Sequence, residues 1–306
     1  MEGAAIYRLP EECVAHAIAM TTPGDACSSS AVSPAFRAAA DSDAVWDRFL
    51  PRDHSAVLAR ADDAVRECSK KELFTRLCSR PVLLDGATMS FGLDRRSGAK
   101  CWMLSARALS IAWGDDTSCW TWSAASLPGT RFPEVAELMD VCWLEITGKL
   151  QLSLLTPRTT YAAYLVFSIA DDSYGLECNV GILPPKATVT VSLSGGNTKP
   201  TSTSTEHTIC LQHMQGEEET AMHRRRQEYV RPSWKHYRRK VTREADMDIR
   251  CPRRRDDGWA EVELGEFAVA GEEEGVVEVG LKEVECRRWK RGLVVQGIEI
   301  RPKHTD

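Results

Sequence analysis

Six short segments between residues 142 and 302 alternate apolar and polar side chains, and glycine, proline or aspartate residues separate them. This alternation is typical of strands that bury one face in a core and expose the other face to water. The six segments are 142–155, 161–170, 188–193, 259–269, 275–286 and 292–302. Because several short strands with turn residues between them favour two packed sheets, we expect an all-β sandwich.

The first fifty residues follow a helical period instead. Leu9, Val14 and Ile18 recur near a spacing of 3.6 residues, and Pro10 suits a first helical turn. A further helix is expected from about Ser33. Fifty residues give little material for an independent core. We therefore expect a small helical bundle with exposed apolar surface that a partner covers.

These patterns divide the chain into a helical domain at 1–54, a helical connector at 55–87 and a β-domain at 88–306. One further helix is predicted inside the β-domain, at 132–139. The strand pattern breaks at about 195–250, where Gly, Ser and Thr residues precede a charge-rich stretch. We interpret this stretch as an insertion between strands.

The composition, 43% hydrophobic and 27% charged, is that of a soluble globular chain. No run approaches the roughly 20 apolar residues of a membrane-spanning helix, so no membrane partner is expected. The N-terminus starts acidic and contains Pro10, unlike a secretory signal. The eleven cysteines show no CxxC or small-domain spacing. We expect reduced thiols in the cytoplasm, the nucleus or both.

A basic run occupies residues 223–255, with 13 Lys and Arg residues against 4 Asp and Glu residues. Three interpretations stay open: a solvated loop, a nuclear-import signal and a nucleic-acid contact. Nucleic acid is not an expected partner, since no nucleic-acid-binding fold accompanies the run. The residues concerned are Arg224, Arg225, Arg226, Trp234, Tyr237, Arg238, Arg239 and Lys240.

The sequence contains none of the common phosphate-binding, dinucleotide-binding, zinc-protease or serine-hydrolase motifs. His207, Cys210 and His213 have a metal-like spacing, but they supply three ligands at most and are otherwise ordinary strand or loop residues. Asp115 and Asp116 could act as a carboxylate pair or simply make a turn soluble. We therefore expect no catalysis, no cofactor and no metal.

Residues 110–124 place Trp113, Trp120 and Trp122 around a turn of Gly, Asp, Thr and Ser residues. Such rings either belong to the core or stack on a ligand. Strand-like surroundings favour the core for four tryptophans: Trp122, Trp143, Trp259 and Trp289.

Four consecutive features of the N-terminus form a motif: the LPEECVAHAIAM start, the PGDAC turn, the VSPAFR helix and the DSDAVWDRFLP close. Together they resemble an F-box. The resemblance implies docking on the Skp adaptor of a cullin-based ubiquitin ligase. By position, it assigns the adaptor-facing and packing residues to Leu9, Pro10, Val14, Ile18, Val32 and Trp46.

Five segments of the β-domain carry a second resemblance: MLSARALSIAWGDDTSCWTW, RFPEVAELMDVCWLEITGKL, YAAYLVF, DDGWAEVELGEF and WKRGLVVQGIEIRP. They are similar to the phloem protein 2-like lectin domain, the Nictaba family of plants. With SKKELFTRLCSRPVLLDG, the resemblance covers nearly the whole chain except 195–250. It implies an α+β multidomain protein in which a small helical F-box precedes an all-β sandwich of the jelly-roll or galactose-binding-like type.

The resemblance also implies binding of N-acetylglucosamine oligomers and the N-glycan core, with the two site tryptophans at Trp113 and Trp120. An indole is the largest flat apolar surface that can cover the C–H face of a pyranose ring. Asp115 and Asp116 are the candidates to accept hydrogen bonds from the sugar. The alternative for the two tryptophans is the core of the sandwich.

The leading hypothesis is a non-catalytic substrate-recognition subunit of an SCF-type (Skp–cullin–F-box) E3 ubiquitin ligase. Its lectin domain would bind a glycan or a glycoprotein. Two alternatives stay open. The chain could be a nucleocytoplasmic carbohydrate-binding lectin with no ligase role, or a receptor that recognises protein surfaces without sugar.

Overall fold

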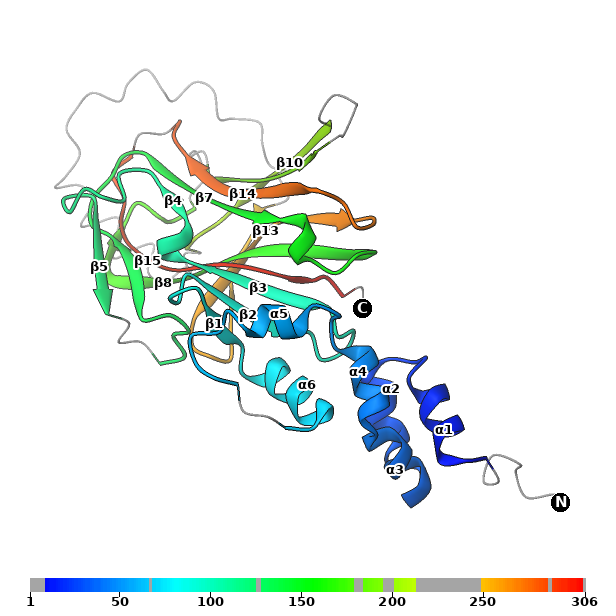
Figure 1. Cartoon of the computed structure of the whole chain (residues 1–306). Helices are drawn as coiled ribbons and strands as arrows, with labels where there is room; N and C mark the ends of the chain where they lie inside the picture. The colour runs from blue at the N-terminus through cyan, green and yellow to red at the C-terminus, as the bar shows by residue number, and fades with distance from the viewer. Residues whose placement is uncertain are drawn as a thin grey trace, which may run out of the picture.

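The computed structural model of the chain describes residues 9–65, 68–124, 128–178, 184–194, 201–212, 249–285 and 288–304. A helical N-terminal part precedes a β-rich domain (Figure 1). The helices are α1 (Glu11–Ile18), α2 (Pro23–Ser29), α3 (Pro34–Asp41), α4 (Asp43–Phe49), α5 (His54–Leu58) and α6 (Lys70–Ser79). The strands are β1 (Val82–Leu84), β2 (Met89–Leu93), β3 (Lys100–Ser105), β4 (Ser110–Ile111), β5 (Trp120–Ala124), β6 (Glu134–Leu138), β7 (Leu144–Gln151), β8 (Thr159–Tyr174), β9 (Lys186–Leu193), β10 (Thr201–Ile209), β11 (Ile249–Arg250), β12 (Arg253–Arg254), β13 (Ala260–Val269), β14 (Gly275–Glu283) and β15 (Arg291–Pro302).

Helices α2 and α3 begin where the sequence supplies capping groups. The Thr22 hydroxyl accepts a hydrogen bond from the Asp25 N–H, and the Asp25 carboxylate accepts one from the Thr22 N–H. At α3 the Ser33 hydroxyl accepts from the Phe36 N–H. Proline occupies the first turn of both helices, where an N–H would have no intrahelical acceptor.

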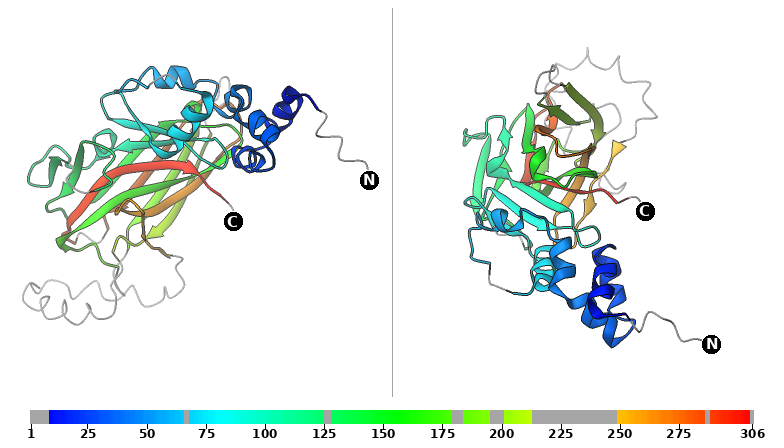
Figure 2. Two further views of the ribbon diagram at one scale, coloured as in Figure 1. Left: turned by 90° about the horizontal axis from the view of Figure 1, so that it is seen from below. Right: turned by 45° about the vertical axis from the view of Figure 1, so that its right-hand side comes forward.

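Helix α6 joins the N-terminal helices to the first sheet. The Phe74 ring packs on the Trp46 ring with centroids 5.2 Å apart, and α6 also contacts β2. Gly98, at φ 73°, passes so close to α4 that a Cβ would lie 2.9 Å from the Phe49 carbonyl oxygen. Beyond this junction, helices α1 to α3 extend away from the sheets (Figures 1 and 2).

Within the described residues the strands form two sheets. The first has the order β1-β2-β3-β15-β8-β13-β12, with β6 beside β15 and β5 beside β6. The second has the order β11-β10-β9-β14-β7-β4. Neighbouring strands run antiparallel, apart from β10 and β11. The six predicted strand segments correspond to β7, β8, β9, β13, β14 and β15, so that prediction is confirmed.

Strand β15 shows how the alternation builds the core. Ile298 and Ile300 belong to the main core, and Glu299 between them lies on the opposite face of the sheet. In the second sheet, Gly148 of β7 faces the same core. A Cβ at this glycine would lie 2.9 Å from the Leu104 side chain of β3. The main core therefore lies between the two sheets.

The helix predicted at 132–139 is wrong, because Glu134–Leu138 forms strand β6. It pairs with β5 on one side and β15 on the other. Val135 and Leu138 are three residues apart, as on one face of a helix, but they lie in two different hydrophobic clusters. Three residues along a strand reverse the side chain's face, so both can be buried on opposite sides of one sheet.

The structure also places strands in stretches that the sequence assigned otherwise. Residues 201–209, expected in an irregular insertion, form β10 and pair with β9. Most of the β10 side chains are polar and exposed, so the strand lacks an apolar alternation, although threonine favours strands. Strand β1, at 82–84, lies within the predicted helical connector, beyond the end of α6 and Pro81.

Candidate functional site

The turn between β4 and β5 carries the tryptophans assigned to the sugar. Trp113 lies in the turn and is 61% exposed, whereas Trp120 begins β5 and is 1% exposed. The expectation that both rings offer a surface to a ligand is therefore wrong for Trp120. Its ring is buried because β5 pairs with β6, opposite Leu138, and this places the side chain in the main core.

Trp120 and Trp122 hold the turn through their polar edges. The Trp120 indole N–H donates to the Ala112 carbonyl at 3.1 Å, and the Trp122 indole N–H donates to the Gly114 carbonyl at 2.9 Å. These carbonyls belong to the residues directly before and after Trp113. Trp113 has φ 64°, a left-handed conformation that costs an L-residue roughly 1–2 kcal/mol. Two indoles thus fix a strained backbone that leaves a third indole exposed.

The two aspartates of the turn lie in different environments. The Asp116 carboxylate accepts hydrogen bonds from the Ser118 hydroxyl at 2.6 Å and the Ser118 N–H at 2.9 Å, and these bonds lower the pKa of Asp116. The Asp116 N–H donates to the Trp113 carbonyl at 2.9 Å. Asp115 is exposed. Asp116 therefore stabilises the turn, and Asp115 remains on the surface near Trp113.

Two further tryptophans are exposed in the β-domain, so the prediction that they belong to its core is wrong. Trp143 is 42% exposed and Trp289 is 57% exposed. The Trp143 indole N–H donates to the Glu145 carboxylate at 3.2 Å. The Glu145 carbonyl of β7 accepts from the Ala112 N–H at 2.9 Å, so Trp143, which directly precedes β7, lies near the Trp113 turn. This end of the domain, near β4 and β5, lies away from helices α1 to α4 (Figure 1).

The period-two pattern contained a signal for Trp143 that sequence reasoning missed. Leu144 and Ile146 are buried, so residues 143 and 145 face outward. For Trp289 the signal is tertiary: the neighbouring Lys290 forms a backbone bridge with Val141, and this pairing buries Lys290 and leaves Trp289 outside.

The core prediction holds for Trp259, which is 1% exposed and shares a second hydrophobic cluster with Met103. Trp122 is half-buried. The Arg107 guanidinium lies over its ring, 3.8 Å from the centroid, and also pairs with Glu134 at 2.9 Å. The Trp122 ring is therefore held at its edge by the N–H bond to the Gly114 carbonyl and on its face by Arg107. Both contacts fix the ring that supports the turn.

The residues assigned to the F-box fall into two groups. The buried group is Val14, Ile18 and Trp46, which pack the helices together. The Trp46 indole N–H is satisfied by the Ala40 carbonyl at 2.6 Å. The exposed group is Leu9, Pro10 and Val32. Leu9 is 51% exposed and Val32 is 61% exposed. Met20, which the sequence analysis did not single out, is 62% exposed. A small bundle thus exposes several large aliphatic side chains.

Three arginines in the described part of the basic run, Arg250, Arg253 and Arg255, pair with carboxylates of the first sheet. Arg253 and Arg255 each bind Glu261 at 2.6 Å, and Arg255 also binds Glu299 at 2.6 Å. Burial alone would raise the pKa of Glu299, but three neighbouring guanidinium groups outweigh it and lower this pKa to about 2. Outside the described residues lie Arg224, Arg225, Arg226, Trp234, Tyr237, Arg238, Arg239 and Lys240.

His207 and Cys210 lie at the end of β10, and His213 lies outside the described residues. In the part of the chain that the structure describes, no group of three or more His, Cys, Asp or Glu side chains is arranged to hold a metal ion. None of the described helices is long and apolar enough to cross a membrane.

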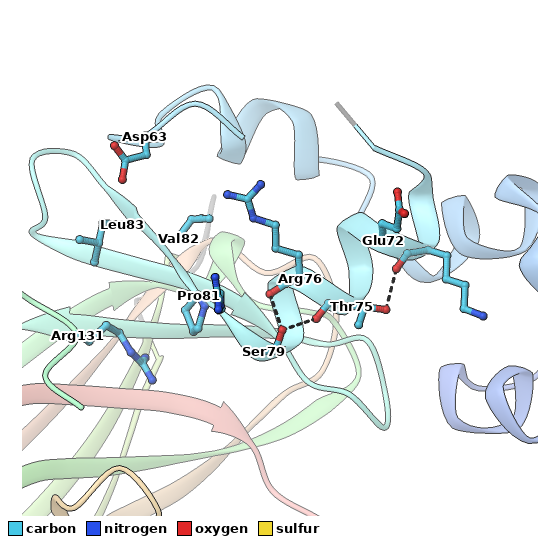
Figure 3. Close-up of a pocket in the computed structure, with 11 residues that line it drawn as sticks. Asp63, Glu72, Thr75, Arg76, Ser79, Pro81, Val82, Leu83 and Arg131 are labelled. Atoms are coloured by element: carbon cyan, nitrogen blue, oxygen red, sulfur yellow. Dashed lines mark hydrogen bonds between the residues drawn. The ribbon is translucent and has the colours of Figure 1, made fainter. Parts of the chain in front are cut away.

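An open cavity of about 810 Å³ lies between α6 and β1 (Figure 3). Its lining includes cations such as Arg76 and anions such as Asp63 and Glu72. Figure 3 shows Glu72 and Arg131 on opposite sides of it. Arg131 already pairs with Glu299 at 3.0 Å. Because its charges are mixed and do not converge, this cavity indicates no particular class of ligand.

Comparison with known proteins identifies the family of the chain. A model of the family described as phloem protein 2 matches residues 99–302. Three similar proteins come from Arabidopsis thaliana. F-box protein PP2-B13 is 39% identical over 96% of this chain and 98% of its own length. F-box protein PP2-B15 is 38% identical over 96% of both chains, and F-box protein PP2-B1 is 36% identical over 97% of this chain and 90% of its own. The chain therefore belongs to the plant F-box proteins that carry a phloem protein 2 domain.

Proposed function

We propose that the chain is the non-catalytic substrate-recognition subunit of an SCF-type E3 ubiquitin ligase in the cytoplasm, the nucleus or both. The helical end binds a Skp-type adaptor, which links it to a cullin. The β-domain, a lectin sandwich of the jelly-roll or galactose-binding-like type, binds a glycan or glycoprotein that carries N-acetylglucosamine oligomers or the N-glycan core. The chain contributes proximity, and a partner enzyme transfers ubiquitin.

The adaptor proposal is supported by the exposed aliphatic side chains of the helical end. Leu9 and Val32 are exposed, whereas Trp46 is buried and packs with the other core residues of the helices. Apolar contacts across an interface release water from both partners, and a few well-packed side chains contribute most of the binding free energy. The helices also extend away from the sheets, which leaves room for a protein of considerable size (Figure 2).

The glycan proposal rests on Trp113. Two features of Trp113 are unfavourable for folding: its backbone has a positive φ, and its large apolar ring is exposed to water. A role in binding explains why the turn nevertheless holds this residue. Its flat face suits the C–H face of a pyranose. Nearby polar groups can bind hydroxyl and acetamide groups: the Asp115 carboxylate, and Glu145, whose pKa is lowered by hydrogen bonds from Lys282 and Trp143.

The test is calorimetric titration of the full chain with the N-acetylglucosamine trimer. A single stacking site gives affinity on the order of millimolar, about 4 kcal/mol. We expect Trp113→Ala to abolish binding. Trp120→Phe retains most of the ring volume but loses the N–H donor to Ala112, so it should weaken binding several-fold by loosening the turn. Trp259→Phe, in the separate cluster, is the matched control and should bind like the wild type.

Two results would overturn parts of the proposal. Undiminished binding by a folded Trp113→Ala variant would move the sugar site elsewhere, and absence of binding by the wild type would favour a receptor for protein surfaces. Adaptor binding is measured separately, by co-purification with a Skp-type protein. If sugar binds and the adaptor does not, the chain is a lectin without a ligase role.

A further inference from the structure

Three cysteines meet at the point where β10 and β11 end. Cys210 directly follows β10, Cys251 directly follows β11, and Cys178 comes from the segment after β8. The Cys178 N–H donates to the Gln212 carbonyl at 3.2 Å, and its thiol lies 3.8 Å from the Ile209 carbonyl oxygen. The Cys210 thiol donates to the Gln212 carbonyl at 3.3 Å, and the thiols of Cys178 and Cys251 lie near enough to it to shift its pKa or to have their own shifted by it. Cys210 is therefore the central member of a three-thiol cluster.

The backbone brings Cys210 and Cys251 into register. Strands β10 and β11 are parallel, with Ile209 opposite Arg250, and the Cys210 N–H donates to the Arg250 carbonyl at 2.8 Å. Cys210 and Cys251 are the residues that follow the last pair of this ladder on its two strands. Neighbouring strands are roughly 4.8 Å apart, and disulfides join Cα atoms that are about 4.4–6.8 Å apart. The two residues can therefore be bridged with little movement of the backbone.

The three thiols differ in exposure and in acidity. Cys210 is 1% exposed, Cys178 is half-buried and Cys251 is exposed. The neighbouring Cys210 thiol lowers the pKa of Cys178, whereas the Cys178 thiol together with burial raises the pKa of Cys210. Cys178 is thus the member of the cluster that most readily forms a thiolate, which is the nucleophilic form.

We propose that this cluster is an oxidation site at which a hydroperoxide converts Cys210 and Cys251 into a disulfide, with Cys178 as the relay thiol. The Cys178 thiolate attacks a peroxide oxygen, the O–O bond breaks, and Cys178 becomes a sulfenic acid. The departing hydroxide takes the Cys210 proton and leaves as water.

The Cys210 thiolate then attacks the Cys178 sulfur and displaces hydroxide, which takes the Cys251 proton and leaves as a second water. Finally the Cys251 thiolate attacks the Cys210 sulfur, and Cys178 departs as a thiolate, because the thiol of lower pKa leaves faster. The net reaction consumes two thiols and one hydrogen peroxide and gives one disulfide and two waters.

This disulfide would close a ring that includes residues 223–250 of the basic run. The ring spans residues 210–251, and β11 is the edge strand of its sheet with only two residues in the ladder. Few backbone hydrogen bonds hold so short a strand, so a covalent link to β10 changes how firmly that edge is attached. Oxidation thus offers control over the segment that carries most of the chain's clustered positive charge.

The test uses the full reduced chain, exposed to hydrogen peroxide, quenched by alkylation and digested with trypsin without reduction. Cleavage after Lys and Arg separates the three thiols into peptides 159–186, 187–224 and 251–253, because Lys199 precedes a proline and is not cut. We expect mass spectrometry to detect peptide 187–224 linked to peptide 251–253, and reduction to release both. Absence of this linked pair after complete reaction of the cluster would overturn the proposal.

Three serine variants give the test its controls. Cys251→Ser, at an exposed position that does not endanger folding, should abolish the link and leave Cys178 joined to Cys210. Cys178→Ser should slow formation of the link on the order of tenfold without abolishing it. Cys68→Ser, an exposed cysteine elsewhere, should change nothing. An unchanged rate in Cys178→Ser would remove the relay, and a wild-type link of peptide 187–224 to peptide 159–186 alone would overturn the assignment of the pair.

Discussion

The two ends of this molecule expose apolar groups of different kinds. The helical end exposes aliphatic side chains in the segments that flank its short helices, at Leu9, Met20 and Val32. The far end of the β-domain exposes indole rings, and the Trp113 ring is held by a backbone at positive φ. Aliphatic groups of this type suit a dry protein interface. Indoles with polar groups beside them suit a ligand that is apolar on one face and polar at its edges.

The difference also concerns what supports each surface. At the helical end, exposure follows from size, because a few short helices cannot cover all of their own apolar side chains. At the Trp113 turn, exposure is enforced by two hydrogen bonds from indoles of the same segment. We expect the aliphatic surface of the helical end to tolerate substitution. Exposure of the Trp113 ring, in contrast, should depend on the indole hydrogen bonds that support its turn. Substitutions at the two surfaces test this contrast.

Truncation of the two site tryptophans should change the free energy of unfolding by very different amounts. Trp120→Ala empties a buried ring site and should lower the free energy of unfolding by roughly 3–5 kcal/mol. Trp113→Ala removes an exposed ring and should change it by about 0.5 kcal/mol or less. Urea unfolding followed by circular dichroism measures both values. Similar losses in the two variants would mean that Trp113 is a core residue after all.

Acid should lower the free energy of unfolding through Glu299, which lies on β15 of the first sheet. Burial disfavours the Glu299 carboxylate, but Arg131, Arg255 and Arg301 outweigh burial and lower its pKa from 4.5 to about 2. The charged form therefore stabilises the fold fully above pH 4.5, and this contribution, on the order of 3 kcal/mol, is lost as the pH falls toward 2.

Glu299→Gln is the control for this acid dependence. The variant should be less stable at neutral pH, because three guanidinium groups lose a common partner. Its stability should also fall less steeply between pH 4.5 and 2 than that of the wild type. Thermal unfolding across this range, measured on both proteins, decides the matter, and parallel curves would contradict the assignment to Glu299.

A charge on the aliphatic surface should separate the functions of the two ends. Val32→Glu places a carboxylate where the proposed adaptor packs, and we expect adaptor binding to weaken at least tenfold, about 1.4 kcal/mol. Folding and binding of the sugar trimer should be unchanged, since Val32 is 61% exposed and lies at the other end. Trp113→Ala is the reciprocal control and should bind the adaptor normally. If either variant lost both adaptor binding and sugar binding, the two ends would not act as separate binding surfaces.

The smallest effect concerns backbone strain. Trp113→Gly should leave stability unchanged or raise it by up to about 1 kcal/mol, because glycine adopts positive φ without strain but has a larger entropy in the unfolded chain. Sugar binding should nevertheless be lost. Unfolding by urea beside calorimetry measures the two properties together. A loss of more than 1 kcal/mol would show that the Trp113 ring contributes to packing.

Sequence reasoning succeeded where a residue's environment follows from its own segment. The period-two runs predicted β7, β8, β9, β13, β14 and β15, and the spacing of Val14 and Ile18 predicted a helix that buries both. It failed where neighbours from elsewhere decide. The segment 132–139, predicted as a helix, contains a strand because β5 and β15 pair with it. Strand β10 has no apolar alternation of its own and is stabilised by its pairing with β9.

By itself, the sequence determined the helical start, the alternating strands and the family resemblance that comparison with known proteins bears out. It also supplied three tryptophans around one turn, but not their separate roles. Only the tertiary structure decided that Trp120 and Trp122 hold the turn and that Trp113 is exposed. The physical reason is that secondary structure follows from local periodicity, whereas exposure of a ring depends on which distant strands pack against its neighbours.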